Sequence, residues 1–152
     1  MSTATPEETI SRSAMHQLFE LLTHQNQYQK FIYECFVPEH YTTPESVTTR
    51  LFKRITEGSL AATNGLICLV WGPKGPEDEW YGTPLGQWVV VHHPDSMVPT
   101  EIAIQVLGFS HQRLHQLSNE GRIKKYRRGL CDRGDVVREW RKRIDSGGIT
   151  KM

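Results

Sequence analysis

The sequence of 152 residues has few cysteines and no long apolar run, and both absences exclude whole classes of protein. Cys35, Cys68 and Cys131 are odd in number, widely spaced and without a CxxC pair, so they predict reduced thiols rather than a disulfide framework or a structural zinc site. No apolar stretch approaches the roughly 20 residues that cross a bilayer. The polar start at residues 1–8 does not have the regions of a signal peptide. We therefore expect a cytoplasmic protein without a membrane partner, associated with the nucleoid if it is bacterial or phage-derived.

A recognisable catalytic constellation is also missing. His92 and His93 follow an apolar run, but no partnered nucleophile or carboxylate pair accompanies them, so a solvated loop is the simpler interpretation. His111 and His115 have the i, i+4 spacing of metal ligands, but no third ligand lies nearby in the sequence. We expect no enzyme activity, no cofactor and no metal site.

Positive and negative side chains are unevenly distributed along the chain, and the sign of the net charge changes near residue 100. Residues 1–99 contain six Lys or Arg and eleven Asp or Glu, whereas residues 100–152 contain twelve and six. A concentrated positive end on a chain of net charge +1 is typical of nucleic-acid-binding proteins. On charge alone, a solvated basic tail is the alternative.

Helical periodicity dominates the first third of the chain. One apolar face runs from about residue 7 to residue 24, and a second periodic piece covers residues 28–36. Thr43-Pro44 has the composition of a helix start, and Gly58 closes the helix that follows. The sequence therefore predicts three helices in this part.

Two short apolar runs change the pattern after this point. Residues 66–71 and 87–91 predict two buried strands of a β-hairpin, and the Gly- and Pro-rich residues 72–86 predict its long loop. After a flexible leader over residues 1–6, we expect residues 7–95 to form an α+β domain of helices plus this hairpin. Its expected role is dimerisation or partner binding.

The positively charged part begins with two short helices and a tight turn between them. Thr100 can cap the first helix, and Gly108 can adopt the left-handed conformation that ends it. Ser110 can then cap a second helix whose Leu114 and Leu117 face inward. Two short helices joined by a Gly-containing turn are the DNA-binding helix-turn-helix arrangement.

The outer side of the second helix carries side chains that suit base edges. No acidic residue occurs from Ser110 to Asn119, and Arg can bind guanine while Gln and Asn can bind adenine. The basic residues 122–129 predict a strand and wing along the phosphates, and Asp132 can cap a final helix over residues 135–143. The candidate DNA-binding residues are Ser110, His111, Gln112, Arg113, His115, Gln116, Asn119, Arg122, Lys124, Lys125, Tyr126, Arg127 and Arg128.

This segment resembles the helix-turn-helix modules of MerR-type and phage excisionase-type regulators. The matching frame consists of Leu107-Gly108-Phe109-Ser110, Leu114, Leu117, Glu120-Gly121-Arg122-Ile123, Asp135-Val136 and Trp140. The resemblance implies a winged helix-turn-helix over residues 99–144, with its second helix in the major groove and its wing on the backbone. It makes Gln112, Arg113 and Gln116 candidate base readers, and Lys124, Arg127 and Arg128 candidate phosphate contacts.

Together these features predict an α+β protein that acts as a sequence-specific transcriptional regulator on double-stranded DNA. Because one small module binds weakly, we expect a homodimer through residues 7–95, with residues 145–152 as a flexible tail. One alternative is an excisionase-like factor that bends DNA. Another is an enzymatic or protein-interaction domain in residues 7–95 that the module targets to DNA. The sequence identifies no small-molecule effector.

Overall fold

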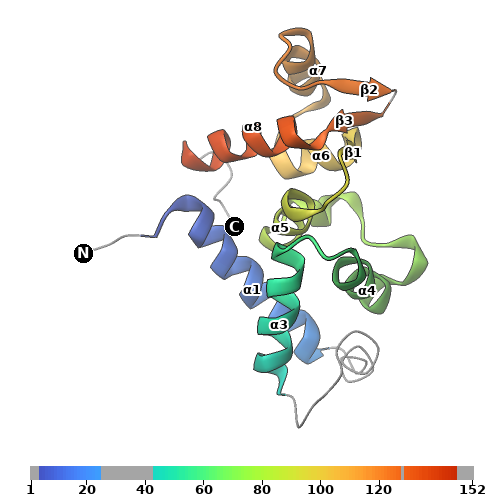
Figure 1. Cartoon of the computed structure of the whole chain (residues 1–152). Helices are drawn as coiled ribbons and strands as arrows, with labels where there is room; N and C mark the ends of the chain where they lie inside the picture. The colour runs from blue at the N-terminus through green and yellow to red at the C-terminus, as the bar shows by residue number, and fades with distance from the viewer. Residues whose placement is uncertain (1–3, 25–42, 128, 147–152) are drawn as a thin grey trace.

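Helices and one small antiparallel sheet make up the part of the chain that the structure describes (Figure 1). This computed structural model describes residues 4–24, 43–127 and 129–146. The helices are α1 (Pro6–His24), α3 (Pro44–Thr56), α4 (Leu60–Trp71), α5 (Pro84–His92), α6 (Thr100–Leu107), α7 (His111–Asn119) and α8 (Arg133–Asp145), with short 3₁₀ turns η1 (Gly72–Lys74) and η2 (Asp78–Gly82). The strands are β1 (Met97–Pro99), β2 (Lys125–Arg127) and β3 (Leu130–Asp132). The predicted helix over residues 28–36 lies outside the described residues.

Most of the helix starts follow from capping residues in the sequence. The side chains of Thr43, Ser59, Thr83, Ser110 and Asp132 each accept a hydrogen bond from a backbone N–H in the first turn of α3, α4, α5, α7 and α8. Such bonds satisfy donors that have no partner within the helix. The predicted helices that start at Thr43-Pro44, Ser110 and Asp132 are therefore confirmed.

The predicted cap at Thr100 is wrong. Pro99 precedes α6, no side chain caps it, and Thr100 is the first residue of the helix. Its hydroxyl is buried 3.5 Å from the Cys131 sulfur, so it faces β3 and not the end of α6. Gly108 does end α6 in the left-handed conformation, with φ 68°.

The predicted β-hairpin in the N-terminal half is also wrong, because both of its strands are helices. Residues 66–71 belong to α4 and residues 87–91 to α5, and residues 72–86 contain η1 and η2. A short continuous apolar run fits a buried strand and a buried helix equally well. The capping signals at Ser59 and Thr83-Pro84 decide the matter in favour of helices. The protein is therefore mainly helical, and its only sheet among the described residues is β1–β3–β2.

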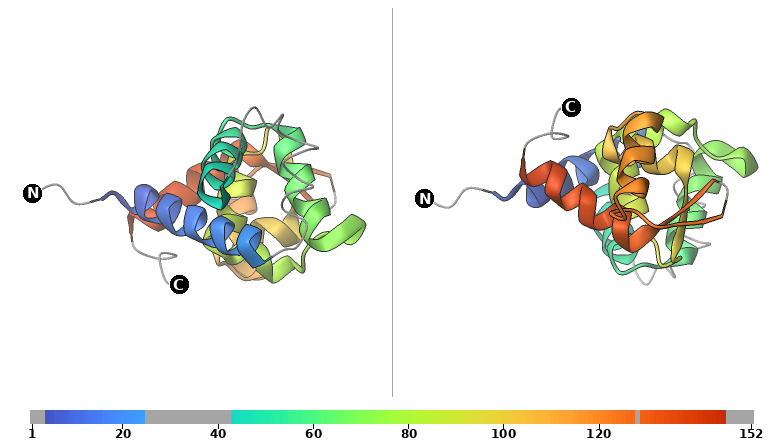
Figure 2. Two further views of the ribbon diagram at one scale, coloured as in Figure 1. Left: turned by 90° about the horizontal axis from the view of Figure 1, so that it is seen from below. Right: turned by 90° about the horizontal axis from the view of Figure 1, so that it is seen from above.

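The helix α5 lies at the centre of the molecule, and seven of its nine residues are buried (Figure 2). The side chain of Gln17 links α1 to the start of α5. Its amide N–H donates to the Thr83 hydroxyl at 3.0 Å, and its carbonyl accepts from the Leu85 N–H at 3.0 Å. A Cβ atom at Gly86 would lie 2.2 Å from the Trp80 carbonyl oxygen, so η2 can pack here only against glycine.

The C-terminal elements pack onto this helical base through α8 and the sheet. Strand β3 pairs with β1 on one side and β2 on the other, both antiparallel. Trp140 of α8 is fully buried, and its indole N–H donates to the Gln87 side chain of α5 at 2.8 Å. Buried side chains from both halves form one continuous core. Within the described ranges, no helix is both long and apolar enough to cross a bilayer.

Candidate nucleic-acid interface

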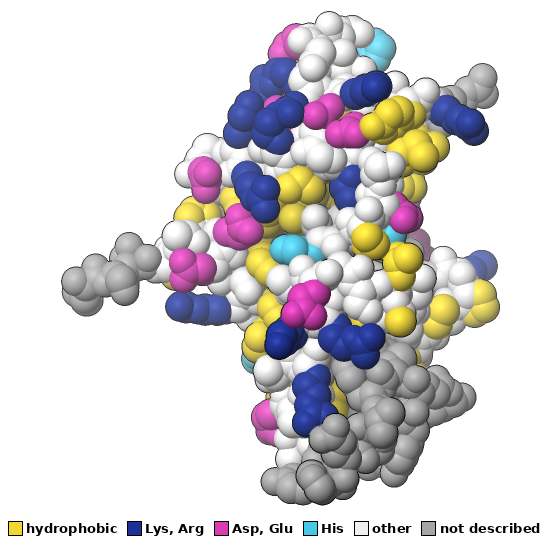
Figure 3. Space-filling model, in the orientation of Figure 1, with side chains coloured by type: hydrophobic (Ala, Val, Ile, Leu, Met, Phe, Trp, Pro, Cys, Tyr) yellow, Lys and Arg dark blue, Asp and Glu magenta, His cyan; other side chains and the backbone are white. Residues whose placement is uncertain are grey.

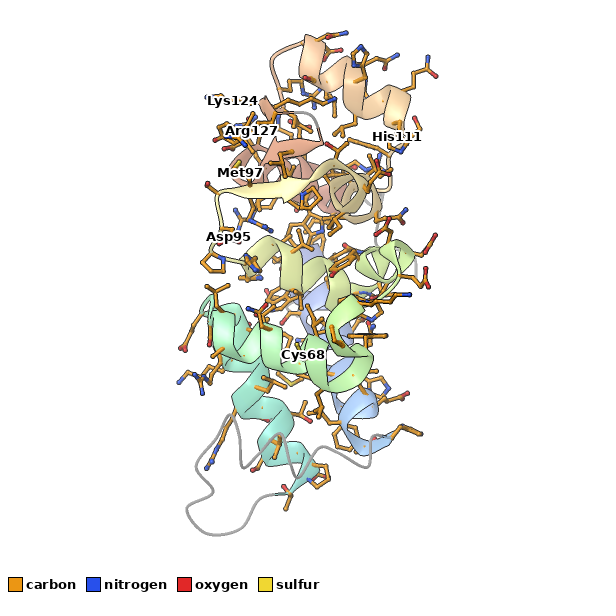
Figure 4. All side chains as sticks on the ribbon, turned by 90° about the vertical axis from the view of Figure 1, so that its right-hand side faces the viewer. Cys68, Asp95, Met97, His111, Lys124 and Arg127 are labelled. Carbon is orange, nitrogen blue, oxygen red and sulfur yellow. The ribbon has the colours of Figure 1, made fainter. Side chains whose placement is uncertain are left out.

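The helix α7 forms one end of the molecule, opposite the end formed by α1 and α3 (Figures 1 and 4). Only Leu114 and Leu117 are buried on it, as the sequence predicted. The predicted groove-facing side chains that are exposed are His111, Gln112, His115, Gln116 and Asn119. An exposed helix at an end of the molecule can approach a large partner without any rearrangement of the core.

Phe109 lies in the turn between α6 and α7, and two arginines, one from α7 and one from α8, lie near its ring. The guanidinium of Arg113 lies 5.7 Å from the centre of the Phe109 ring, and that of Arg143 lies 4.5 Å from it. Arg113 also donates to the Gln116 side chain at 3.3 Å, so these two predicted base readers lie together. The Ser110 hydroxyl, another predicted contact, accepts the Arg113 N–H at 3.1 Å. The cap fixes the backbone of Arg113 on the first turn of α7, and the Phe109 ring lies beside its guanidinium.

The predicted contact His111 has an acidic neighbour. Its Nε2 lies 3.1 Å from a carboxylate oxygen of Glu101 on α6, and both side chains are exposed. Among residues 4–24, 43–127 and 129–146, no three His, Cys, Asp or Glu side chains gather as metal ligands would. The pair therefore links the outer surfaces of α6 and α7.

The hairpin of β2 and β3 presents cations beside α7. Lys125, Tyr126 and Arg127 of β2 are all exposed, and the ammonium of Lys124 lies 4.9 Å from the centre of the Tyr126 ring. The backbone of β2 pairs with β3, but the side chains of Lys125 and Arg127 make no hydrogen bond or ion pair with another described residue. These cations are available to an anionic partner. Arg128, also predicted as a phosphate contact, lies outside the described residues.

An acidic residue at the end of β3 links the two strands of the hairpin and α8. The Tyr126 hydroxyl donates to the Asp132 carboxylate, which also caps α8. This hydrogen bond from Tyr126 is the largest cause that lowers the pKa of Asp132, and the same bond raises the pKa of Tyr126. The Lys124 N–H donates to Asp135 at 2.9 Å, which ties the start of β2 to α8. The exposed cations therefore lie on a hairpin that hydrogen bonds to Asp132 and Asp135 hold against the start of α8.

Arg122 differs from the other predicted phosphate contacts because an acid already neutralises it. Its guanidinium donates to the Glu139 carboxylate at 2.5 and 3.3 Å, and the Glu139 side chain is only 2% exposed. The hydrogen bonds to Glu139 raise the pKa of Arg122. Loss of Glu139 would leave Arg122 with the exposed Glu120, 3.6 Å away, as its remaining carboxylate partner, so Arg122 serves the fold of this module first.

Sequence reasoning missed the cations of α8. Arg138 and Lys142 are about half exposed and near Glu139, and Arg143 donates to the Leu107 carbonyl at 2.9 Å at the end of α6. The spacing of Arg138 and Lys142, four residues apart, could have indicated a shared helix face. Arg143 could not be placed beside Phe109 without the fold.

Positive charge therefore flanks α7, while the outer face of α7 is mostly uncharged. Figure 3 shows Lys and Arg side chains on both sides below the tip of the molecule and few charges at the tip itself. This combination can hold a polyanion from the sides and offer neutral hydrogen-bonding groups to it at the centre. No protein family, curated protein or solved structure matches this chain.

Proposed function

We propose that the chain binds double-stranded DNA in a sequence-specific manner through a winged helix-turn-helix. In this proposal α6 and α7 are the two helices, and the β2–β3 hairpin is the wing. The helix α7 enters the major groove, and Gln112, Arg113 and Gln116 read base edges. Lys124, Lys125 and Arg127 contact phosphates. The protein acts as a transcriptional regulator in the cytoplasm, where DNA is accessible to it.

The observation that carries this proposal is the exposed outer face of α7, which has no acidic side chain. A helix of nine residues is about 14 Å long at about 1.5 Å per residue. The major groove is about 12 Å wide and admits such a helix. Gln and Asn offer donor and acceptor pairs to adenine, and Arg offers two donors to guanine.

The β2–β3 hairpin supports the same mode of DNA binding. Lys125 and Arg127 form no ion pair with a carboxylate among the described residues, whereas Arg122 pairs with Glu139. Phosphate contacts of this kind give affinity that does not depend on sequence and that falls as salt rises. Base contacts from α7 would supply the discrimination between sites.

We also propose that two copies bind together through residues 7–95. The helix α4 supports this part, since it contains no charged residue and leaves Leu60 44% exposed. Pairing through the end of the molecule away from α7 would leave both α7 helices free. Two linked modules bind a two-fold site far more tightly than one module binds a half-site.

Selection of bound fragments from a random duplex library, using the full chain, tests the proposal. We expect one enriched motif. Two symmetric half-sites would support the homodimer, whereas tandem sites with bending would favour an architectural factor in its place. The variant with Gln112→Glu and Gln116→Glu should lose the motif, because it places two acids on the groove face.

A matched control keeps the change of charge and moves it elsewhere. Arg50→Gln with Lys53→Gln on the exposed side of α3 also lowers the net charge by two, and it should keep the motif. Absence of any enriched motif, or equal loss in both double variants, would contradict sequence-specific binding by α7.

A further inference from the structure

A cleft lies between α4 and β1. Its volume is about 260 Å³, which is near the lower end of small-molecule sites. Most of its wall is apolar, with Ile67 from α4, Val98 from β1 and Ile102 from α6. In Figure 4, the helix that carries Cys68 lies below it and the strand that carries Met97 lies above it. The cleft is thus walled by both halves of the chain.

Arg133 brings a buried positive charge into this wall. The residue is 8% exposed, and its guanidinium donates to the carbonyls of Asp95 at 2.6 Å, of Met97 at 2.9 Å and of Val90. A guanidinium has five N–H groups, so two are left without an acceptor among the described residues. Burial lowers the pKa of Arg133, and the charge of Asp95 offsets this only in part. Buried charges are ordinarily paired with an opposite charge.

The carboxylate nearest in sequence does not fill this role. The Asp95 side chain is 66% exposed and lies 3.7 Å from the His93 ring. No ion pair joins any described acid to Arg133. The guanidinium is therefore bonded to carbonyl dipoles, and Asp95 acts on it only through space, without a direct ion pair.

His93 adds a second donor to the same wall. The Asp95 N–H donates to Nδ1 of His93 at 3.2 Å, which leaves the proton of a neutral ring on Nε2. Burial lowers the pKa of His93, and the positive charge of Arg133 lowers it further, against the effect of Asp95. Asp95 also lines the cleft, but its carboxylate is mostly exposed and forms no ion pair with Arg133. A cleft with these donors and largely apolar walls matches a ligand with one anionic group and an apolar body.

We propose that this cleft binds a small organic carboxylate, with its carboxylate on the two remaining N–H groups of Arg133 and its apolar body between Ile67 and Ile102. A carboxylate matches the planar fork of a guanidinium better than a single-point acceptor does. The bound molecule would touch α4, β1 and the first residue of α8 together. It would thereby stabilise the junction between the two halves. This inference does not depend on DNA binding.

Titration of the full chain with 3-phenylpropionate, without DNA, tests the site. We expect NMR shifts of the Ile67 and Ile102 methyl groups that saturate, together with a raised unfolding temperature. The neutral 3-phenylpropionamide, which has the same body, should bind about tenfold more weakly, since hydrogen bonds to a charged group are stronger than those to a neutral one. Inorganic phosphate lacks the apolar body and should bind more weakly than the carboxylate.

Cleft-lining variants keep the test independent of Arg133, whose loss would disturb the fold. Ile67→Trp fills the cleft from partly exposed α4 and should abolish the methyl shift of Ile102, whereas Thr49→Trp, at an exposed position of α3 outside the cleft, should leave binding unchanged. Asn64→Asp adds an anion to the wall and should weaken the carboxylate but not the amide. Equal binding of carboxylate and amide, or no shift with 3-phenylpropionate up to about 10 mM, a weak limit by the usual scale of affinities, would overturn the proposal.

Discussion

The helices α5 and α7 both have nine residues, but they meet opposite environments. Seven residues of α5 are buried, among them Trp88 and three consecutive valines, whereas only Leu114 and Leu117 of α7 are buried. Both helices start at a hydroxyl cap, so local signals alone do not distinguish them. The difference in burial comes from the elements that pack around each helix, which surround α5 and leave the outer side of α7 open.

This contrast separates residues that maintain the fold from residues that can serve a partner. Each buried side chain of α5 excludes water from the core, and its polar atoms are bonded within the protein. The Trp88 indole donates to the Thr56 hydroxyl at 2.8 Å, and the Gln87 amide donates to the Gly82 carbonyl at 2.7 Å. The outer side chains of α7 have few such partners. We therefore expect substitutions in α5 to change stability and substitutions outside on α7 to change binding.

The largest expected effect is that of Trp88→Ala. Trp88 is almost fully buried and its ring stacks on Phe52 with centroids 5.5 Å apart. Its loss should lower the free energy of unfolding by about 3–5 kcal/mol, measured by urea denaturation. Gln112→Ala on α7 should change it by no more than about 0.5 kcal/mol. Similar losses for both variants would break the contrast between the two helices.

Next in size is the loss of Arg113, which tests α7 as the reader of DNA. Arg113→Ala should weaken binding to the selected site by roughly 1–3 kcal/mol and binding to random duplex much less. Fluorescence anisotropy with both duplexes measures the two values. An equal loss on both would remove Arg113 from base reading and leave it a role in the turn beside Phe109.

A third prediction concerns the hairpin. Lys124→Ala together with Arg127→Ala should weaken binding to every sequence and should reduce the slope of log affinity against log salt by about 1–2 units. Arg12→Ala together with Arg50→Ala, on α1 and α3, removes the same charge at the other end. Only the hairpin variant should alter the slope. An unchanged slope would place the hairpin away from phosphate.

The smallest expected effect is the pH dependence of Asp132→Asn. The pKa of Asp132 is lowered in the folded protein, so its carboxylate stabilises the fold above its unfolded pKa of about 3.9, and this contribution is lost as the pH falls through the folded pKa. Asparagine also caps helices, so at pH 7 the variant should lose at most about 1 kcal/mol. The difference in stability from the wild type should shrink between about pH 5 and pH 2. A difference that stays constant would show that Asp132 acts without its charge.

The parts of the fold that the sequence predicted correctly are those with capping or helix-terminating residues nearby in the sequence. Pro44 after Thr43, Gly108 with its positive φ and Ser110 mark helix ends through bonds within a few residues. The same kind of signal at Thr83-Pro84 marks α5, but the apolar run behind it was interpreted as a strand. A buried helix and a buried strand are equally apolar, so composition could not separate them.

The parts that the sequence did not predict depend on contacts between distant residues. The pairing of Arg122 with Glu139, and the three carbonyls around Arg133, join residues that are 17 to 43 positions apart. Strand β1 has only three residues and includes a proline, so its pairing with β3 has no local signature. Exposed candidates on α7 were easier to predict because an outward position follows from the helical period alone.

The most direct test of the account is an NMR titration of the full chain with its selected duplex, at low and at high salt. We expect amide and side-chain signals of Gln112, Arg113, Gln116 and the hairpin to shift and those of α5 to stay, and we expect the shifts to diminish as salt rises. Shifts confined to other surfaces, with α7 unchanged, would contradict this expectation.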